Sequence, residues 1–208
     1  MTTRGNGVPE AADERIAAAL LRGSWQGDPE AFLQLYDRYG SELYAYLYLV
    51  LTSAVDAEQA TYDVLETAID RFRRYELGPV PFRVWLFWLA HDRVGASRSR
   101  RRPPEDGDPL ASLITRLPVG GREALVLLRV LGFSLAEVSL ILRRAPGRVG
   151  VLEARALESL GEMLAVRDGA EREDPAPERA GASERLSLRL RSRESPVSYR
   201  RRWALALR

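Results

Sequence analysis

Apolar residues recur every three or four positions along most of this chain, which is the spacing of one face of an α-helix. Four such stretches lie between residues 28 and 97, and others lie between residues 110 and 164. No convincing alternation of apolar and polar residues, the pattern of a half-buried strand, occurs before residue 183. The sequence therefore predicts an all-α fold.

Capping residues predict where the first helices begin. Asp28 is suited to cap a helix whose first turn starts at Pro29. Gly40 predicts a break before a second helix over residues 41–51, and a third helix is expected over residues 53–72, starting at a serine.

The fourth helix is predicted over residues 82–97, where an apolar stripe is followed by a cluster of arginines. The stripe consists of Phe82, Trp85, Leu86, Leu89 and Val94. Trp88 lies off this stripe, so a second face of the helix is available for another role. We expect the four helices to form one domain over residues 15–97, after a disordered N-terminus over residues 1–14.

A second helical domain is predicted after a charged, proline-rich linker over residues 98–109. Within residues 110–164, one helix is closed by Gly132, and Ser134 with Glu137 forms an S-x-x-E capping box for the next. A tight turn then leads into a further helix, which is helix-turn-helix spacing. The remainder, residues 165–208, is expected to be a mostly disordered basic tail.

Charge is segregated along the chain although the formal net charge is only +2. Residues 1–97 contain 9 Arg and 14 Asp or Glu, a net charge of −5. Residues 98–104 contain four arginines, and residues 165–208 have 11 Arg against 7 acidic residues, a net charge of +4. An acidic front and a basic back indicate two kinds of partner, a basic protein surface and nucleic acid.

The composition argues against an enzyme and against a cofactor or metal site. The chain has one histidine, His91, and no cysteine, which leaves little for a metal site or a nucleophilic relay. No phosphate-binding glycine loop occurs. No apolar run reaches 18 residues and no signal peptide is recognisable, so we expect a cytoplasmic protein with no membrane insertion.

Several motifs occur in an order that is itself informative. They are "GDPEAFLQLYDRY", Phe82-x-x-Trp85-Leu86, the arginine-rich linker, and Leu117-Pro118 followed by Arg122-Glu123-Ala124. Over about residues 20–163 this order resembles the extracytoplasmic-function (ECF) group of bacterial sigma factors. The resemblance implies an N-terminal region 2-type four-helix bundle, a flexible linker and a C-terminal region 4-type helix-turn-helix domain. It also implies a DNA-binding transcription initiation factor whose partners are core RNA polymerase and promoter DNA, and it leaves open whether an anti-sigma factor is a further partner.

The resemblance assigns roles to particular residues. The helix over 53–72 would dock on a basic coiled coil of the largest polymerase subunit, through the carboxylates of Asp56, Glu58, Asp63 and Glu66. The alternative for each carboxylate is a solvated helix face. The following loop and helix would read the minus-ten element through Tyr75, Trp88, Arg93 and Arg98, while packing against the linker is the alternative for Trp88. DNA phosphate would be contacted by Arg100, Arg101 and Arg102 in the linker and by Arg143, Arg144, Arg148 and Arg155 in the helix-turn-helix.

The chain also departs from the family pattern. Trp88 and Asp92 stand where the family often has a basic residue and an asparagine, and an anion at residue 92 would repel phosphate. Arg143 and Arg144 occupy the turn of the helix-turn-helix, and few residues remain on the next helix for base contacts. Two other hypotheses therefore stay open: a sigma-like regulator that binds polymerase or another protein without productive promoter reading, and a general helix-turn-helix regulator.

Overall fold

The computed structural model describes residues 7–72, 80–96 and 109–171, and it contains helices and no strand in those ranges. The predicted all-α fold is confirmed. The elements are α1 (Gly7–Trp25), α2 (Pro29–Leu51), α3 (Ala54–Arg71), α4 (Phe82–Ala96), α5 (Pro109–Arg116), α6 (Val119–Leu125), the π-helical turn η2 (Val126–Val130), α7 (Leu135–Leu142) and α8 (Pro146–Glu171). Among these described helices, none has the length and apolarity needed to cross a membrane.

The helix starts in the first half of the chain follow the predicted caps. The Asp28 carboxylate accepts a hydrogen bond from the Glu30 backbone N–H at 3.0 Å, and the Ser53 hydroxyl accepts one from Asp56 N–H at 3.2 Å. Each cap satisfies a backbone donor that the helix itself cannot pair.

The predicted break at Gly40 is wrong, because α2 is one continuous helix from Pro29 to Leu51. Gly40 is buried in the middle of α2, and a Cβ at this position would stand 3.3 Å from the ring of Tyr36. A glycine inside a helix costs about 1 kcal/mol relative to alanine but does not end it. Burial of both halves of α2 in the core outweighs that cost.

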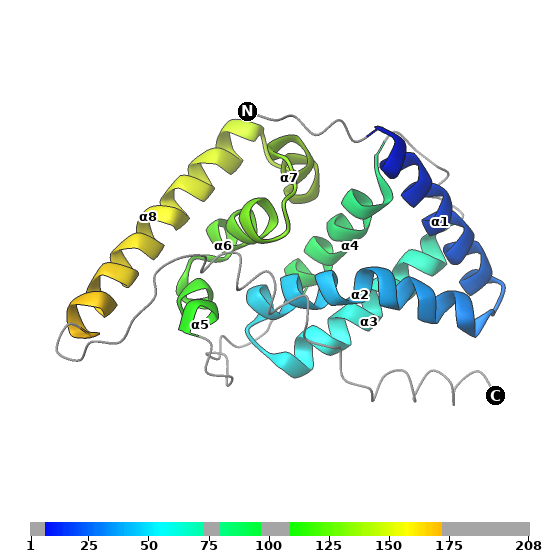
Figure 1. The fold of residues 1–208 in the computed structure, drawn as a ribbon, viewed down its shortest axis with the longest axis horizontal. Helices are drawn as coiled ribbons and strands as arrows, with labels where there is room; N and C mark the ends of the chain where they lie inside the picture. Colours follow the sequence, from blue (N-terminus) through cyan, green and yellow to red (C-terminus); the bar gives the residue numbers. More distant parts are fainter. Residues whose placement is uncertain (1–6, 73–79, 97–108, 172–208) are drawn as a thin grey trace.

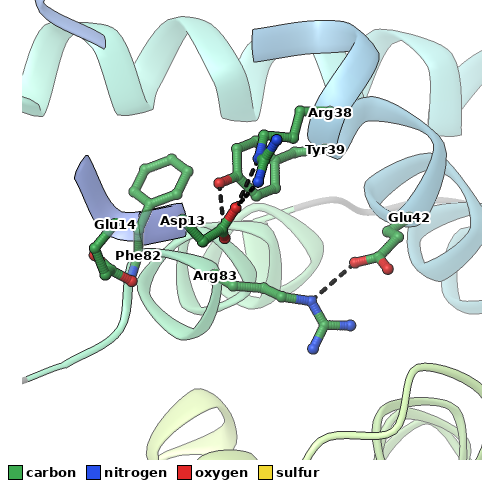
Figure 2. Close-up of polar contacts among 7 residues, drawn as sticks. All are labelled: Asp13, Glu14, Arg38, Tyr39, Glu42, Phe82 and Arg83. Carbon is green, nitrogen blue, oxygen red and sulfur yellow. Dashed lines mark hydrogen bonds and ion pairs between the residues drawn. The ribbon is translucent and has the colours of Figure 1, made fainter. Parts of the chain in front are cut away.

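Residues 7–14 of the N-terminus predicted to be disordered are helical, because α1 begins at Gly7, and residues 1–6 lie outside the described ranges. Ala17 and Leu21 are buried in the core. Figure 2 shows how polar side chains fasten α1 to its neighbours: the Asp13 carboxylate accepts hydrogen bonds from Arg38 and Tyr39 of α2. Glu14 accepts the backbone N–H of Phe82 and so caps the first turn of α4 from another element.

The second half of the chain contains the predicted helix-turn-helix. Both hydrogen bonds of the Ser134–Glu137 capping box are present. Gly132 has φ +73° where the preceding helix ends, and Arg143 has φ 51° in the turn between α7 and α8. Helix α8 continues to Glu171, so the first residues of the predicted disordered tail are helical instead.

The N-terminal half, which consists of α1–α4, packs against the C-terminal half, which consists of α5–α8. The two halves share one continuous hydrophobic core that extends from α1 to α8. Helix α4 lies between them: it contacts α2 and α3 on one side and α7 on the other (Figure 1). The ring of Phe87 on α4 is 5.6 Å from the ring of Tyr46 on α2 and 4.9 Å from that of Phe133 before α7. Helix α4 is thus buried on two faces, which explains why its aromatic residues exceed a single stripe. The division into domains over residues 15–97 and 110–164 stays a prediction.

Candidate functional site

Helix α3 presents acidic side chains on the face opposite the core. Its buried side consists of Ala57, Ala60, Thr61, Val64, Leu65, Ala68 and Ile69. On the other side Asp56 and Glu66 are exposed, and Glu58 and Asp63 are half-buried. The four carboxylates predicted to bind polymerase therefore lie on a helix whose packing leaves that face accessible.

Glu58 differs electrostatically from its neighbours. Burial raises the pKa of the Glu58 carboxyl above its ordinary value, because partial removal from water disfavours the charged form. The negative charge of Glu58 is therefore not a source of stability for the folded free chain.

Asp63 and Arg93, predicted for two different surfaces, are paired with each other. The Arg93 guanidinium donates to Asp63 Oδ2 from Nε at 3.0 Å and from Nη2 at 2.7 Å. Gln59 Nε2 donates to the other carboxylate oxygen at 2.7 Å. This network ties α3 to α4, so both residues already have a role in positioning the two helices.

Trp88 and Asp92 of α4 meet the turn of the helix-turn-helix. The guanidinium carbon of Arg143 lies 4.4 Å from the centre of the Trp88 ring, within cation–π range, and Arg143 Nη2 lies 3.2 Å from Asp92 Oδ2. A residue expected to read the minus-ten element is thus in contact with one expected to face DNA in the helix-turn-helix. Residues 98–108 of the linker lie outside the described ranges, so the interpretation of Trp88 as packing against the linker stays a prediction.

The other helix-turn-helix arginines are accessible. Arg144, Arg148 and Arg155 are exposed, and no ion pair to another described residue engages them. Five of the predicted site residues fall outside the described ranges, and these are Tyr75, Arg98, Arg100, Arg101 and Arg102.

Two buried charged residues, Arg122 and Glu123, form an anchor that joins the two halves. Neither residue was assigned a role from the sequence. Arg122 of α6 donates from Nη1 to the Val50 carbonyl at 2.9 Å and to the Leu49 carbonyl at 3.3 Å, and from Nη2 to the Leu117 carbonyl at 2.9 Å. Carbonyls at the end of α2 lack partners within that helix, so a cation there is favourable. The sequence signal for this anchor was the pair of charged residues at the start of the apolar run "GREALVLL". Charged side chains within a buried segment need hydrogen-bond or ion-pair partners, so such a pair indicates contacts to another element.

Glu123, the neighbour of Arg122, is 5% exposed and joins three elements. Its Oε1 atom accepts a hydrogen bond from the Tyr46 hydroxyl at 2.8 Å and lies 2.7 Å from His91 Nδ1. Burial, and to a smaller extent the negative charge of Glu123, raises the pKa of the Tyr46 hydroxyl. The hydroxyl therefore keeps its proton and donates a hydrogen bond to Glu123. His91 takes part in this structural contact. In the part of the chain that the structure describes, no group of His, Cys, Asp and Glu is arranged to hold a metal ion.

Comparisons with known proteins agree with the sequence resemblance. Residues 35–102 match the family model for sigma-70 region 2. The chain is 25% identical over 178 residues to the ECF RNA polymerase sigma factor BldN of Streptomyces coelicolor, covering 74% of this chain and 67% of that protein. It is 30% identical over 175 residues to the ECF RNA polymerase sigma factor SigM of Mycobacterium tuberculosis, covering 73% of this chain and 86% of that protein.

A solved structure has a similar fold. The structure of CnrH in complex with the cytosolic domain of CnrY superposes with a TM-score of 0.59 at 25% sequence identity, covering 73% of this chain and 98% of that chain.

Proposed function

Because the chain belongs to the ECF RNA polymerase sigma factors, we propose that it binds core RNA polymerase through the acidic face of α3 and directs it to promoter DNA. It is a transcription initiation factor and not an enzyme. Its place of action is the cytoplasm, where its polymerase is. We propose in addition that a protein partner regulates it, since CnrH was solved in complex with the cytosolic domain of CnrY.

The acidic face of α3 is the observation that carries the polymerase assignment. Asp56 and Glu66 are exposed there, and burial opposes the charge of Glu58. A carboxylate that does not stabilise its own fold as an anion is well suited to a basic partner, since opposite charge on that partner favours the ionised form.

Exposed arginines support the DNA side of the proposal. Arg144, Arg148 and Arg155 project from the turn before α8 and from α8 itself, and arginines so placed can contact phosphate and fix the register of the helix on DNA. We propose the same phosphate-binding role for Arg100, Arg101 and Arg102 of the linker. Tyr75 and Arg98 remain proposed contacts to the minus-ten element, and Arg93 contributes there if its pairing with Asp63 is exchanged for phosphate.

The proposed polymerase contact can be tested by charge reversal on α3. Asp56→Arg combined with Glu58→Arg should lower affinity for core RNA polymerase at least about tenfold, because rim charges of one sign would then face a basic surface. The matched control is Glu30→Arg with Asp37→Arg on α2, which makes the same change in net charge and also alters one acid in the first turn of a helix. Circular dichroism should show equal helix content in both variants. Equal core affinity in both variants would remove the basis for placing polymerase on α3.

The similarity to named ECF sigma factors over most of the chain does not favour the other two hypotheses, a regulator without promoter reading and a general helix-turn-helix regulator.

A further inference from the structure

We propose that Trp88, Asp92 and Arg143 form a self-inhibitory latch, which holds the two DNA-facing surfaces of the free chain against each other. The proposal rests on the proposed function, since it assumes that these surfaces face DNA. The latch also links two departures from the family pattern: Asp92, the unusual carboxylate on α4, is the partner of Arg143, the unusual arginine in the turn.

Arg143 makes this contact from the C-terminal cap of α7. The residue ends α7 in the left-handed conformation, with φ 51° and ψ 45°, where glycine is the usual occupant because a side chain is strained there. From this position its guanidinium reaches α4, lying over the Trp88 ring and beside the Asp92 carboxylate. A glycine at this helix end would make neither of these two contacts.

The contact excludes DNA from both of its sides. A base can stack on Trp88 only if the guanidinium leaves that ring face, and Arg143 can contact phosphate only if it leaves Asp92. Asp92 itself repels phosphate, so its negative charge favours the closed arrangement and disfavours the DNA-bound one. The latch therefore lowers DNA binding by the free chain until the two halves separate.

Neighbouring contacts hold the latch in register. Arg83 of α4 donates to the Leu131 carbonyl at 2.9 Å and lies 3.9 Å from the centre of the Phe133 ring, just before α7. Arg83 Nε donates to Glu42 of α2 at 2.9 Å, and this ion pair orients the Arg83 side chain at the N-terminal end of α4 (Figure 2). The buried anchor of Arg122 and Glu123 secures the same interface further inside.

The latch lies at the accessible rim of this interface, unlike the anchor. The Arg143 and Asp92 side chains are 55% and 40% exposed. Their charges can therefore be exchanged without leaving a buried group unsatisfied, and the variants should keep the fold.

The first test measures the distance between the halves in the free chain. The chain has no cysteine, so spin labels can be placed at two exposed positions, Ala19→Cys on α1 and Glu158→Cys on α8. Figure 1 shows that these two helices lie at opposite ends of the molecule. We expect one narrow distance distribution for the unmodified latch and an added population of longer distances for Asp92→Arg. Asp92→Arg with Arg143→Asp, which restores opposite charges, should return the narrow distribution. Identical distributions for all three proteins would overturn the latch.

The second test measures binding of the free chain to a single-stranded DNA oligonucleotide of mixed sequence. Glu30→Arg on α2 makes the same change in net charge as Asp92→Arg, so it corrects for the change in net charge. Asp92→Arg with Arg143→Asp keeps the arginine at residue 92 in a restored pair, so it corrects for a direct phosphate contact at that position and should not bind more tightly than the unaltered protein. We expect Asp92→Arg to bind the oligonucleotide about fivefold more tightly than Glu30→Arg, as a moderate shift toward the open state requires. Equal affinity of the two variants would contradict the latch. Both tests are made without polymerase, so a failure to bind core polymerase would refute the proposed function while leaving the distance result interpretable.

Discussion

Arg122 shows how one side chain joins the two halves of this molecule. It is 1% exposed and donates to two carbonyls of α2 and one carbonyl just before α6. A buried acceptor that loses its hydrogen-bond donor destabilises the fold by about 1–3 kcal/mol, which is more than the hydrogen bond itself contributes to stability. The stability of the interface should therefore depend on this residue far more than on any exposed arginine.

Replacing Arg122 with methionine, which keeps much of the apolar stem, should lower the free energy of unfolding by about 2–4 kcal/mol. Arg155→Met, at an exposed position, should change it by no more than about 0.5 kcal/mol. Urea unfolding followed by circular dichroism measures both values. A loss below about 1 kcal/mol for Arg122→Met would mean that the buried hydrogen bonds contribute little.

Glu58 predicts a dependence on pH with a definite sign. Its pKa in the folded chain is raised by burial above the value of the unfolded chain, so the folded state binds more protons between those two values. Stability consequently falls as the pH rises through that interval, and the loss persists at neutral pH. Glu58→Gln should remove this part of the pH dependence and leave stability at pH 7 equal or higher, while core polymerase affinity decreases. A less stable Glu58→Gln protein at pH 7 would show that the charge supports the fold.

At the scale of elements, features fixed by neighbouring residues could be predicted and features fixed by distant contacts could not. The caps at Asp28, Ser53 and Ser134 depend on atoms two or three residues away, and each is present. Gly40 misled because burial of α2 overrides a local helix breaker. The start of α1 was missed because its short apolar stripe is completed only by docking on other helices.

The candidate site divides in the same way. The acidic face of α3 follows from helical periodicity, so its exposure could be expected from the sequence. Trp88 could be placed off the stripe of its helix, but its partner Arg143 is 55 residues away and only tertiary packing brings the two together. The anchor residues Arg122 and Glu123 were recognised as a motif, but their partners on α2 and α4 could not be identified without the structure.

The capping box of α7 supports a quantitative prediction for the helix-turn-helix. Ser134→Ala removes one of two reciprocal hydrogen bonds and should destabilise the protein by about 1 kcal/mol. Ser139→Ala is a suitable control, because that hydroxyl only bonds back to the Leu135 carbonyl within the same helix. Thermal unfolding should show a clear decrease in Tm for the first variant and little change for the second. Similar Tm values for both would mean that the capping box does not stabilise α7.

At the scale of the whole molecule, separate charged segments are expected to serve one DNA-bound assembly. Replacing Arg98, Arg100, Arg101 and Arg102 with alanine should flatten the slope of log affinity against log salt by about 3–4 units, if each arginine neutralises one phosphate. The measurement is promoter binding by the holoenzyme over a range of salt concentrations. A slope equal to that of the unaltered protein would make the linker a spacer rather than a DNA contact.

The central claim is that this chain converts core RNA polymerase into an enzyme that starts transcription at particular promoters. The most direct measurement is in vitro transcription with purified core polymerase on a genomic fragment library, followed by sequencing of the RNA 5′ ends. We expect discrete start sites that core polymerase alone does not produce and that are strongly reduced by Asp56→Arg with Glu58→Arg. RNA 5′ ends identical to those made by core polymerase alone would contradict the claim.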